Sequence, residues 1–365
     1  MSLRWRGDDR NAGSHRRDVI NIGLFIPVSG PAGIWGPSCR SCAEMAAAEI
    51  NAQGGLTGQE IVLHIVDAGR LSTEVAVSAA SMLHAGEMDA LIGMHTSDIR
   101  KAIAEQVRGS IPYIYTPLYE GGDVGGGVFC IGETPMMQIL PAIDRLVERF
   151  NAQRWVLIGN NYIWPHRTHQ IVRRYFSARQ QVVLDEIYLP FGMKDYSLIL
   201  ERLKILSPDA VLLSMVGEDA VHFNRAFGKA GLAASMLRFS CAIEENLLLA
   251  IGDANLERLF VASGYFSALG NRGNESFRER YYSRYGESAP ALNTIGQGLY
   301  EGLYFLKALD SACDDKHWLT INSPIRNGAV RDNIYDPRAG GAASIYLAEA
   351  KGYNFDIIET LQWRH

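Results

Sequence analysis

The chain has 365 residues, of which 47% are hydrophobic, and 35 Lys and Arg against 40 Asp and Glu give a formal net charge of −5. This length favours two globular domains, and the slightly acidic balance excludes a basic surface for nucleic acid or acidic lipid. No apolar run approaches the roughly 20 residues that cross a bilayer. We therefore expect a soluble protein without a direct nucleic-acid partner.

The N-terminal end and the cysteines both bear on the cellular compartment. Residues 1–18 are rich in arginine and lack the apolar core of a secretory signal, which predicts a disordered leader and a cytoplasmic protein. If a native signal peptide has been replaced at this end, the periplasm is expected instead. The five cysteines are odd in number and scattered, which favours a reduced compartment. Cys39 and Cys42 have no second pair to complete a zinc site, so we expect them to pack in the first turn of a helix.

Strand-like and helix-like segments alternate from residue 19 onward, which is typical of parallel strands joined by crossover helices. The glycine-dense stretch 121–127 precedes a strand rather than a helix, so it predicts a flexible connection and not a phosphate loop. This first half is expected to form a doubly wound sheet. Its strands are predicted at 19–27, 61–66, 90–93, 112–115 and 128–131, and its helices at 42–51, 73–84 and 97–107.

A second series of the same design follows. Two helices come after its last strand, and they are expected to return and cover the first unit. Two β segments are expected within 324–349. The strands are predicted at 155–158, 182–188, 210–214, 237–240 and 259–265, and the helices at 136–150, 165–179, 196–206, 218–230, 274–285 and 292–309.

No strong catalytic signature occurs in the chain. A nucleophile elbow, a Walker loop and a metalloprotease helix are all absent from the sequence. His166 and His169 are three residues apart on a predicted helix, but no carboxylate or cysteine lies nearby in the sequence, so they predict a solvated face rather than a metal site. We expect no enzyme activity, no metal and no cofactor.

Polar and aromatic residues follow four predicted strands, at the sheet edge where ligands bind in doubly wound folds. Ser97 is expected to cap the helix that follows it, to present its hydroxyl to the crevice, or both. Tyr162 and Trp164 are large for a strand-to-helix junction, and we expect them to close over a small ligand seated on the Ser97 loop. The four stretches are 93–97, 115–120, 161–164 and 216–219.

Several of these stretches resemble the type I periplasmic-binding-protein fold and, within it, the leucine/isoleucine/valine-binding family. Residues 43–55, which end in Glu-Ile-Asn-x-x-Gly-Gly, resemble the wider family. Tyr-Glu-Gly at 119–121 and Tyr-Ile-Trp-Pro at 162–165 resemble only the branch that binds short amides and urea. Residues 97–102 and 223–227 extend the resemblance, which runs from about residue 20 to beyond residue 310.

The resemblance implies two doubly wound α/β lobes joined by a three-stranded hinge. One lobe would consist of residues 19–132 and 264–322, and the other of residues 133–263 and 323–365. The resemblance also implies a ligand between the lobes, held by His95, Ser97, Tyr115, Thr116, Pro117, Tyr162, Trp164 and Glu218. Glu218 or its neighbour Asp219 would either pair with an amino group or accept hydrogen bonds from an amide, and the sequence leaves both open.

Three functions follow from this resemblance and from the residues. The first is a cytoplasmic sensor that closes over a short aliphatic amide or urea and regulates an amidase operon through an antiterminator protein. The alternative is the substrate-binding protein of an ABC transporter for urea, amides or branched-chain or polar amino acids, with a permease as its partner. The third, an amide hydrolase, lacks a recognisable nucleophile with a base. The oligomeric state stays open, a homodimer included.

Overall fold

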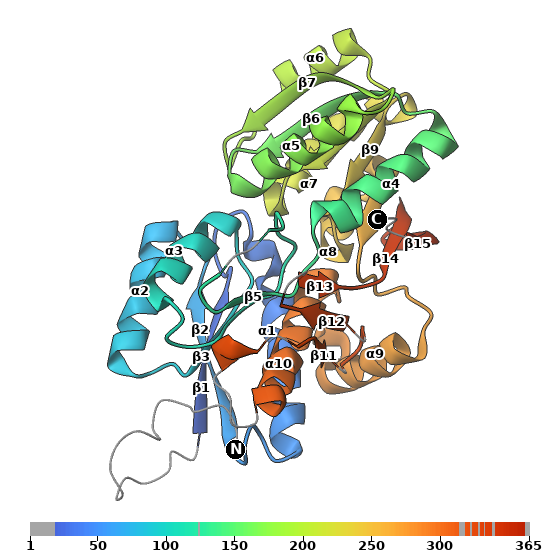
Figure 1. Ribbon diagram of the computed structural model, residues 1–365. Helices are drawn as coiled ribbons and strands as arrows, with labels where there is room; N and C mark the ends of the chain where they lie inside the picture. The colour runs from blue at the N-terminus through green and yellow to red at the C-terminus, as the bar shows by residue number, and fades with distance from the viewer. Residues whose placement is uncertain are drawn as a thin grey trace, which may run out of the picture.

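The computed structural model describes residues 19–122, 125–313, 318–321, 323–327, 329–331, 333–337 and 340–361. The expected leader at residues 1–18 lies outside these ranges. Two α/β lobes lie one above the other, and the chain passes from one to the other between β5 and α4, again after β10, and again before β14 (Figure 1). Within the described residues, no helix has the length and apolar character needed to cross a membrane.

The first lobe is built on a five-stranded parallel sheet in the order β2-β1-β3-β4-β5. Alternate residues of β1 (Val19–Ile26) point to opposite faces of the sheet, so that Ile22 and Leu24 join the apolar cluster under α1 and α10, whereas Phe25 joins the cluster under α2 and α3. The strands are β1 (Val19–Ile26), β2 (Glu60–Asp67), β3 (Ala90–Gly93), β4 (Tyr113–Tyr115) and β5 (Val128–Cys130). The helices are α1 (Gly36–Ala52), α2 (Ser72–Ala85), α3 (Ser97–Val107), α9 (Arg272–Tyr285) and α10 (Thr294–Cys313).

The second lobe is built on a seven-stranded sheet in the order β15-β14-β10-β9-β8-β6-β7. The strands from β6 to β10 pair in parallel, and the hairpin of β14 and β15 adds two antiparallel strands next to β10. The strands are β6 (Arg154–Asn160), β7 (Val182–Leu189), β8 (Ala210–Ser214), β9 (Leu237–Ser240), β10 (Leu259–Ser263), β14 (Ile345–Lys351) and β15 (Asn354–Leu361). The helices are α4 (Pro135–Phe150), α5 (Ile163–Ser177), α6 (Ser197–Leu206), α7 (Gly217–Lys229) and α8 (Glu245–Ile251).

A third, small antiparallel sheet forms near the crossing segments. It consists of β11 (Ile325–Asn327), β12 (Asn333–Asp336) and β13 (Gly340–Ala342), with β11 against α10 and β13 beside β5. The sequence-based boundary placed residues 323–365 together in the second lobe. The sheets assign β14 and β15 there, while β11 to β13 belong to neither large sheet. The exact lobe boundaries stay a prediction.

A buried ion pair joins the crossing segments. Arg331, just before β12, donates from Nη1 to Oε1 of Glu133 at 2.7 Å, and Glu133 lies between β5 and α4. Arg331 also donates from Nη2 to the carbonyl oxygen and hydroxyl of Thr294, the first residue of α10. Gly264, directly after β10, leaves room for this pair, because a Cβ there would lie 1.9 Å from Glu133 Oε1. One arginine therefore contacts two crossing segments and the start of α10.

The α/β alternation predicted from the sequence is confirmed. The stretch 121–127 connects β4 to β5 without a helix, although residues 123 and 124 lie outside the described part of the chain. Cys39 and Cys42 are buried in α1, where burial raises the pKa of both thiols well above the ordinary value, in keeping with a packing role.

Candidate ligand-binding site

A small cavity lies between the lobes, at the carboxyl ends of the strands. In the first sheet β1 lies between β2 and β3, and in the second sheet β6 lies between β7 and β8, so the chain winds both ways from each of these strands. Ligands bind at such switch points in doubly wound folds. The cavity measures about 40 Å³. Because one water needs roughly 10–15 Å³ by this measure, the cavity has room for only a few heavy atoms.

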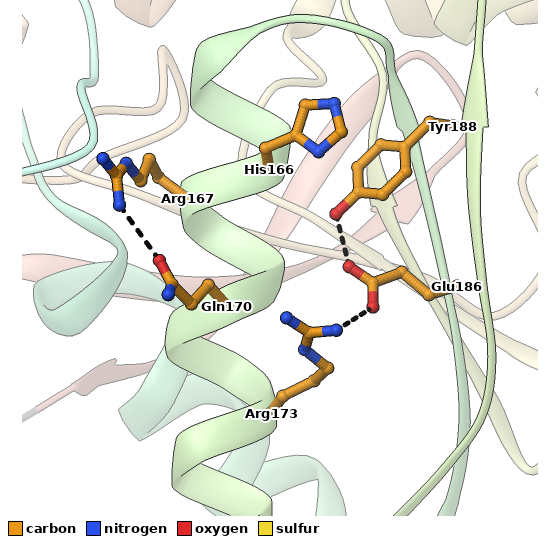
Figure 2. A pocket seen from close by; sticks show the side chains of 6 residues that line it. All are labelled: His166, Arg167, Gln170, Arg173, Glu186 and Tyr188. Carbon is orange, nitrogen blue, oxygen red and sulfur yellow. Dashed lines mark hydrogen bonds and ion pairs between the residues drawn. The ribbon is translucent and has the colours of Figure 1, made fainter.

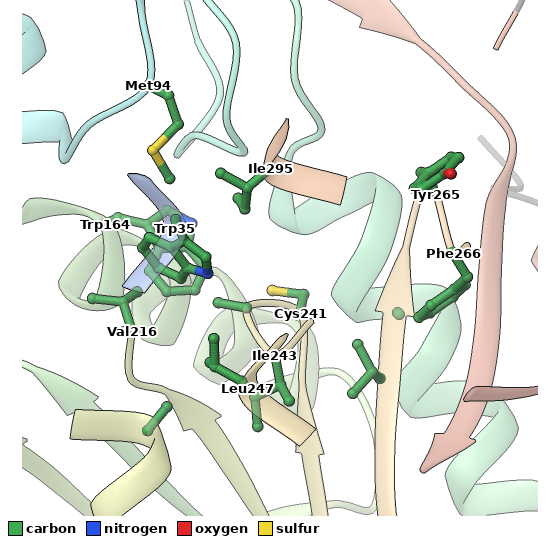
Figure 3. Close-up of a cluster of buried hydrophobic side chains, with 14 of the residues drawn as sticks. Trp35, Met94, Trp164, Val216, Cys241, Ile243, Leu247, Tyr265, Phe266 and Ile295 are labelled. Carbon is green, nitrogen blue, oxygen red and sulfur yellow. The ribbon is translucent and has the colours of Figure 1, made fainter. Parts of the chain in front are cut away.

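Almost every lining residue follows the carboxyl end of a strand, and the single exception is Ile295 at the start of α10. Apolar side chains from both lobes meet here, and Figure 3 shows Trp35, Met94, Trp164, Val216 and Ile295 grouped where the lobes join. The lining residues are Ala32 and Trp35 after β1, Met94, His95, Thr96 and Ser97 after β3, Tyr115, Pro117 and Leu118 at and after the end of β4, Tyr162 and Trp164 after β6, Val216 after β8, Ala242 and Glu244 after β9, and Ile295.

The structure brings six of the eight predicted ligand-binding residues to this one cavity: His95, Ser97, Tyr115, Pro117, Tyr162 and Trp164. Thr116 and Glu218 do not line it. The Thr116 side chain faces α10, where a Cβ on Gly302 would lie 2.7 Å from its Cγ2. Glu218 is exposed at the start of α7, where its backbone N–H donates to the carbonyl of Pro31 at 2.8 Å.

Asp219, the other acidic residue that follows β8, forms hydrogen bonds within the second lobe. Its carboxylate accepts hydrogen bonds from Asn160 Nδ2 at 2.9 Å and from the backbone N–H of Gly192 at 3.0 Å. Burial raises the pKa of Asp219, and these two hydrogen bonds oppose the shift. Its carboxylate therefore ties β6 to the loop after β7 and does not line the cavity.

His95 lines the cavity, while its ring nitrogens bond within the first lobe. Nε2 lies 3.0 Å from the hydroxyl of Tyr113, and Nδ1 lies 3.2 Å from the carbonyl of Thr96. Burial lowers the pKa of His95 to about 3, so the ring is neutral at physiological pH. Because both ring nitrogens already have hydrogen-bond partners, His95 contributes an aromatic surface to the cavity wall.

Ser97 is not the cap of α3. The N-cap position belongs to Thr96, which makes no side-chain capping bond, and Ser97 is the first residue of the helix. The Ser97 hydroxyl donates instead to Oε2 of Glu120 at 2.9 Å. Glu120 is in turn paired with the guanidinium of Arg100. The Tyr-Glu-Gly stretch therefore places a buried charge behind the cavity wall.

Tyr162 and Trp164 lie at the junction of β6 and α5, as the sequence predicts, and both line the cavity. Tyr162 is partly buried and packs against Phe191, with 5.4 Å between the ring centroids. Trp164 is buried, and its indole Nε1 has no hydrogen-bond partner among the described residues. A buried N–H donor in the wall of a cavity favours a ligand that supplies an acceptor.

Glu244 is the important cavity residue that the sequence reasoning missed. It follows β9 and is the N-cap residue of α8. Its Oε2 accepts a hydrogen bond of 2.8 Å from Trp35 Nε1, whereas its Oε1 is buried without a partner in the described structure. Burial raises the pKa of Glu244 to about 8, against the opposing bond from Trp35. The strand-end rule that found residues 93–97 would have found Glu244 if it had also been applied after residues 237–240.

Three contacts between the lobes show that the cleft is closed. They join the segment after β1 to α7 and α8 of the other lobe: Trp35 to Glu244 as above, the backbone N–H of Glu218 to the Pro31 carbonyl, and Asn246 Nδ2 to the Ile34 carbonyl at 3.1 Å. A Cβ on Gly217 would lie 2.1 Å from the oxygen of Pro31. The two lobes therefore meet at backbone distance beside the cavity.

The two predicted solvated histidines differ. His166 is exposed, stacks on Tyr188 with 3.8 Å between centroids, and lies in an open polar pocket with Arg173 and Glu186 (Figure 2). His169 is buried and its Nε2 lies 3.2 Å from Ser214 Oγ, so the prediction is wrong for this residue, because its side of α5 faces the sheet. Among the described residues, no group of three His, Cys, Asp or Glu side chains is placed to hold a metal ion.

Known proteins of similar sequence and structure agree with this fold. The chain is 29% identical over 106 residues to the Leu/Ile/Val-binding protein BraC3 of Rhizobium johnstonii, an alignment that spans 29% of this chain and 28% of that protein. The match therefore covers little more than a quarter of this relative's length.

Solved structures match nearly the whole chain. The branched-chain amino acid transporter substrate-binding protein LivJ from Streptococcus pneumoniae, in complex with isoleucine, aligns with a TM-score of 0.82 and 18% identity, and covers 94% of this chain and 99% of its own. A solute-binding protein of an ABC transporter from Rhodopseudomonas palustris, in complex with p-hydroxybenzoic acid, aligns with a TM-score of 0.86 and 16% identity, over 95% of this chain and 98% of its own. At these identities the likeness concerns the fold.

The family assignment comes from the sequence itself. Residues 19–332, from β1 to the edge of β12, match the family described as "Periplasmic binding protein". The match includes both large sheets except for the final hairpin, and all the residues that line the cavity. The chain therefore belongs to the periplasmic binding protein family.

Proposed function

We propose that this protein is the substrate-binding component of an ABC-type transporter, and that its cleft takes a short aliphatic amide or urea. The observation that carries the ligand class is a pair of buried polar atoms on side chains that line one cavity: Trp164 Nε1 and Glu244 Oε1, each without a partner among the described residues. The small size of the cavity supports the same class.

An amide matches this pair chemically. Leaving a buried donor or acceptor unpaired costs roughly 1–3 kcal/mol, so a ligand gains affinity by satisfying both atoms at once. At neutral pH the raised pKa keeps Glu244 protonated, so its free oxygen carries an O–H donor. A primary amide and urea each carry a carbonyl oxygen whose two lone pairs can accept from Trp164 Nε1 and from this O–H, together with N–H donors for other acceptors. Both are uncharged, and most of the remaining lining residues are apolar or aromatic, such as Met94, Tyr162 and Ile295. A short alkyl group would fill that part of the cavity.

The transporter role rests on the relatives. LivJ is named as a transporter substrate-binding protein, and the Rhodopseudomonas protein as a solute-binding protein of an ABC transporter. These names favour the transporter alternative over the amide-sensing regulator expected from the sequence. A transporter component of this kind works outside the inner membrane, so the proposal places the protein in the periplasm rather than in the cytoplasm, with a permease as its partner.

Isothermal titration calorimetry and thermal shift of the purified protein test the proposal. A ligand with about four heavy atoms gains at most roughly 6 kcal/mol, so we expect dissociation constants of tens of micromolar for acetamide, propionamide or urea. Isoleucine and p-hydroxybenzoate, the ligands of the structural relatives, serve as comparison ligands. Binding of isoleucine without binding of any amide would overturn the ligand class, and a lack of heat with every solute would overturn the binding function.

A further inference from the structure

The hydroxyl group of Ser97 donates its proton to a group outside the cavity. Ser97 is 1% exposed and lines the cavity wall, and its Oγ donates to Oε2 of Glu120 at 2.9 Å. A serine hydroxyl has one proton and two lone pairs. With the proton on the Glu120 side, Ser97 offers only lone pairs to a molecule in the cavity, and it acts there as an acceptor.

Glu120 is held in the form that accepts this proton. Its Oε1 accepts from Nη2 of Arg100, and both side chains are buried, with 4% of the Arg100 side chain and 10% of the Glu120 side chain exposed. The Arg100 guanidinium lies 4.9 Å from the ring centroid of Tyr115. Burial alone raises the pKa of Glu120, but the charge and hydrogen bonds of Arg100, together with the Ser97 hydroxyl, outweigh it and lower the pKa below its ordinary value. An ionised carboxylate can only accept hydrogen bonds.

The one competing acceptor that the described residues place beside Ser97 does not draw its proton away from Glu120. The other polar group beside Ser97 is the hydroxyl of Tyr115, and that hydroxyl donates its own proton to the carbonyl of His95 at 2.6 Å. Tyr115 is neutral, because burial raises its pKa well above the ordinary value. Between a neutral phenol and a paired carboxylate, the carboxylate is the stronger acceptor.

We propose that Glu120 is a positioning residue that fixes the polarity of Ser97, so that the cavity selects solutes presenting an N–H donor to Ser97 and rejects carboxylates at this point. The inference rests on the proposed function and deepens it. A carboxylate oxygen facing Ser97 would meet lone pairs, with the charge of Glu120 directly behind them. An amide NH2 meets the same atom with a proton.

The test compares acetamide with acetate, which have the same shape and the same number of heavy atoms. Calorimetry of the wild type is expected to show acetamide binding about 100-fold more tightly than acetate, because a site built around one hydrogen-bonding pattern leaves buried groups unpaired with the other. Equal binding of both solutes by the wild type would overturn the inference. If acetamide and urea do not bind at all, the proposed function itself fails.

Two variants then distinguish a positioning role of Glu120 from a role in folding stability alone. In the paired variant Arg100→Met with Glu120→Leu, both charges leave together, since removal of one alone would leave a buried unpaired charge. The Ser97 proton is then free, and we expect the ratio of acetamide to acetate affinity to fall about tenfold. Ser97→Ala, which tests the same atom without touching the ion pair, should weaken acetamide about tenfold and leave acetate unchanged.

The matched control is Glu49→Gln. Glu49 also pairs with an arginine of the first lobe, Arg280, at 2.8 Å, but neither residue lines the cavity. This variant should keep the wild-type ratio. The inference is overturned if the wild type prefers acetamide and the paired variant and Ser97→Ala both preserve that preference, or if Ser97→Ala weakens acetate as much as acetamide. Should the paired variant fail to fold, the Ser97→Ala result decides alone.

Discussion

The indole N–H of Trp35 donates a hydrogen bond of 2.8 Å to the carboxyl group of Glu244, although the two residues are 209 positions apart and belong to different lobes. Both residues line the cavity, so this bond closes the cleft directly beside the ligand position. It also leaves the second oxygen of Glu244 as the atom without a partner among the described residues. Closure of the lobes and hydrogen bonding to a ligand in the cavity are thus coupled through one carboxyl group.

We expect Gly217→Ala to weaken ligand binding by at least about tenfold. Gly217 has a φ of 56°, and a Cβ there would lie 2.1 Å from the Pro31 oxygen of the opposite lobe, so the closed state becomes crowded. Calorimetry with the best amide ligand measures the effect. Gly231→Ala is the control, because Gly231 has a φ of 71° in the same lobe, but a Cβ added there would have no described atom within 4 Å. Equal losses in both variants would attribute the effect to backbone strain instead.

The contribution of Glu244 to the stability of the ligand-free protein should fall as the pH rises. Burial raises the pKa of Glu244 from 4.5 to about 8, so the folded protein holds this proton more tightly than the unfolded chain does. The stabilisation is complete below about pH 4.5 and is lost as the pH approaches about 8. Thermal melts across this range measure the slope.

Glu244→Gln keeps an acceptor for Trp35 but cannot ionise, so its melting temperature should fall less than that of the wild type over this range, by about 5 °C. Glu245, whose pKa is raised to about 7 by burial, and His95 and His169, whose pKa values are lowered to about 3, are unchanged in both proteins and contribute slopes of opposite sign, so the difference between the two proteins reports on Glu244. Identical slopes for the two proteins would show that Glu244 does not carry the pH dependence.

Gly264→Ala should destabilise the crossing segments. Its Cβ would lie 1.9 Å from Glu133 Oε1 and 3.1 Å from Arg331 Nη1, which forces apart a buried ion pair. We expect the free energy of unfolding to fall by about 3 kcal/mol in denaturant titrations. Gly270→Ala, at an exposed glycine with no described atom within 4 Å of the added carbon, should change it by no more than about 0.5 kcal/mol. A stable Gly264→Ala protein would mean that the pair can separate at little cost.

Much of the architecture could be predicted because buried parallel strands and amphipathic helices leave strong periodic patterns. The predicted strand at 210–214 and helix at 97–107 coincide with β8 and α3, and the rule that ligands lie beyond strand ends located Ser97, Tyr162 and Trp164 at one cavity. The loops that reach the cleft could be predicted because they follow the carboxyl ends of the strands, and local sequence patterns show where each strand ends.

The orientation of individual side chains was harder to predict. Glu218 and Asp219 are adjacent at the start of α7, yet one is exposed and the other is buried against Asn160, because the rotation of the helix is set by packing. Thr116 follows β4 but faces α10, whose close approach depends on glycines far along the chain. The bond from Ser97 to Glu120 likewise joins two loops through a tertiary contact. These side-chain orientations depend on tertiary neighbours that a single sequence does not reveal.

The position of the last hairpin has a consequence for biosynthesis. β10 ends at Ser263, and its antiparallel neighbour β14 begins only at Ile345, after α9, α10 and the small sheet. As the chain leaves the ribosome, one edge of β10 stays open until these intervening segments have been made. An open strand edge is a template for wrong pairing. The edge of β10 is thus exposed to wrong strand pairing until the C-terminal hairpin is in place.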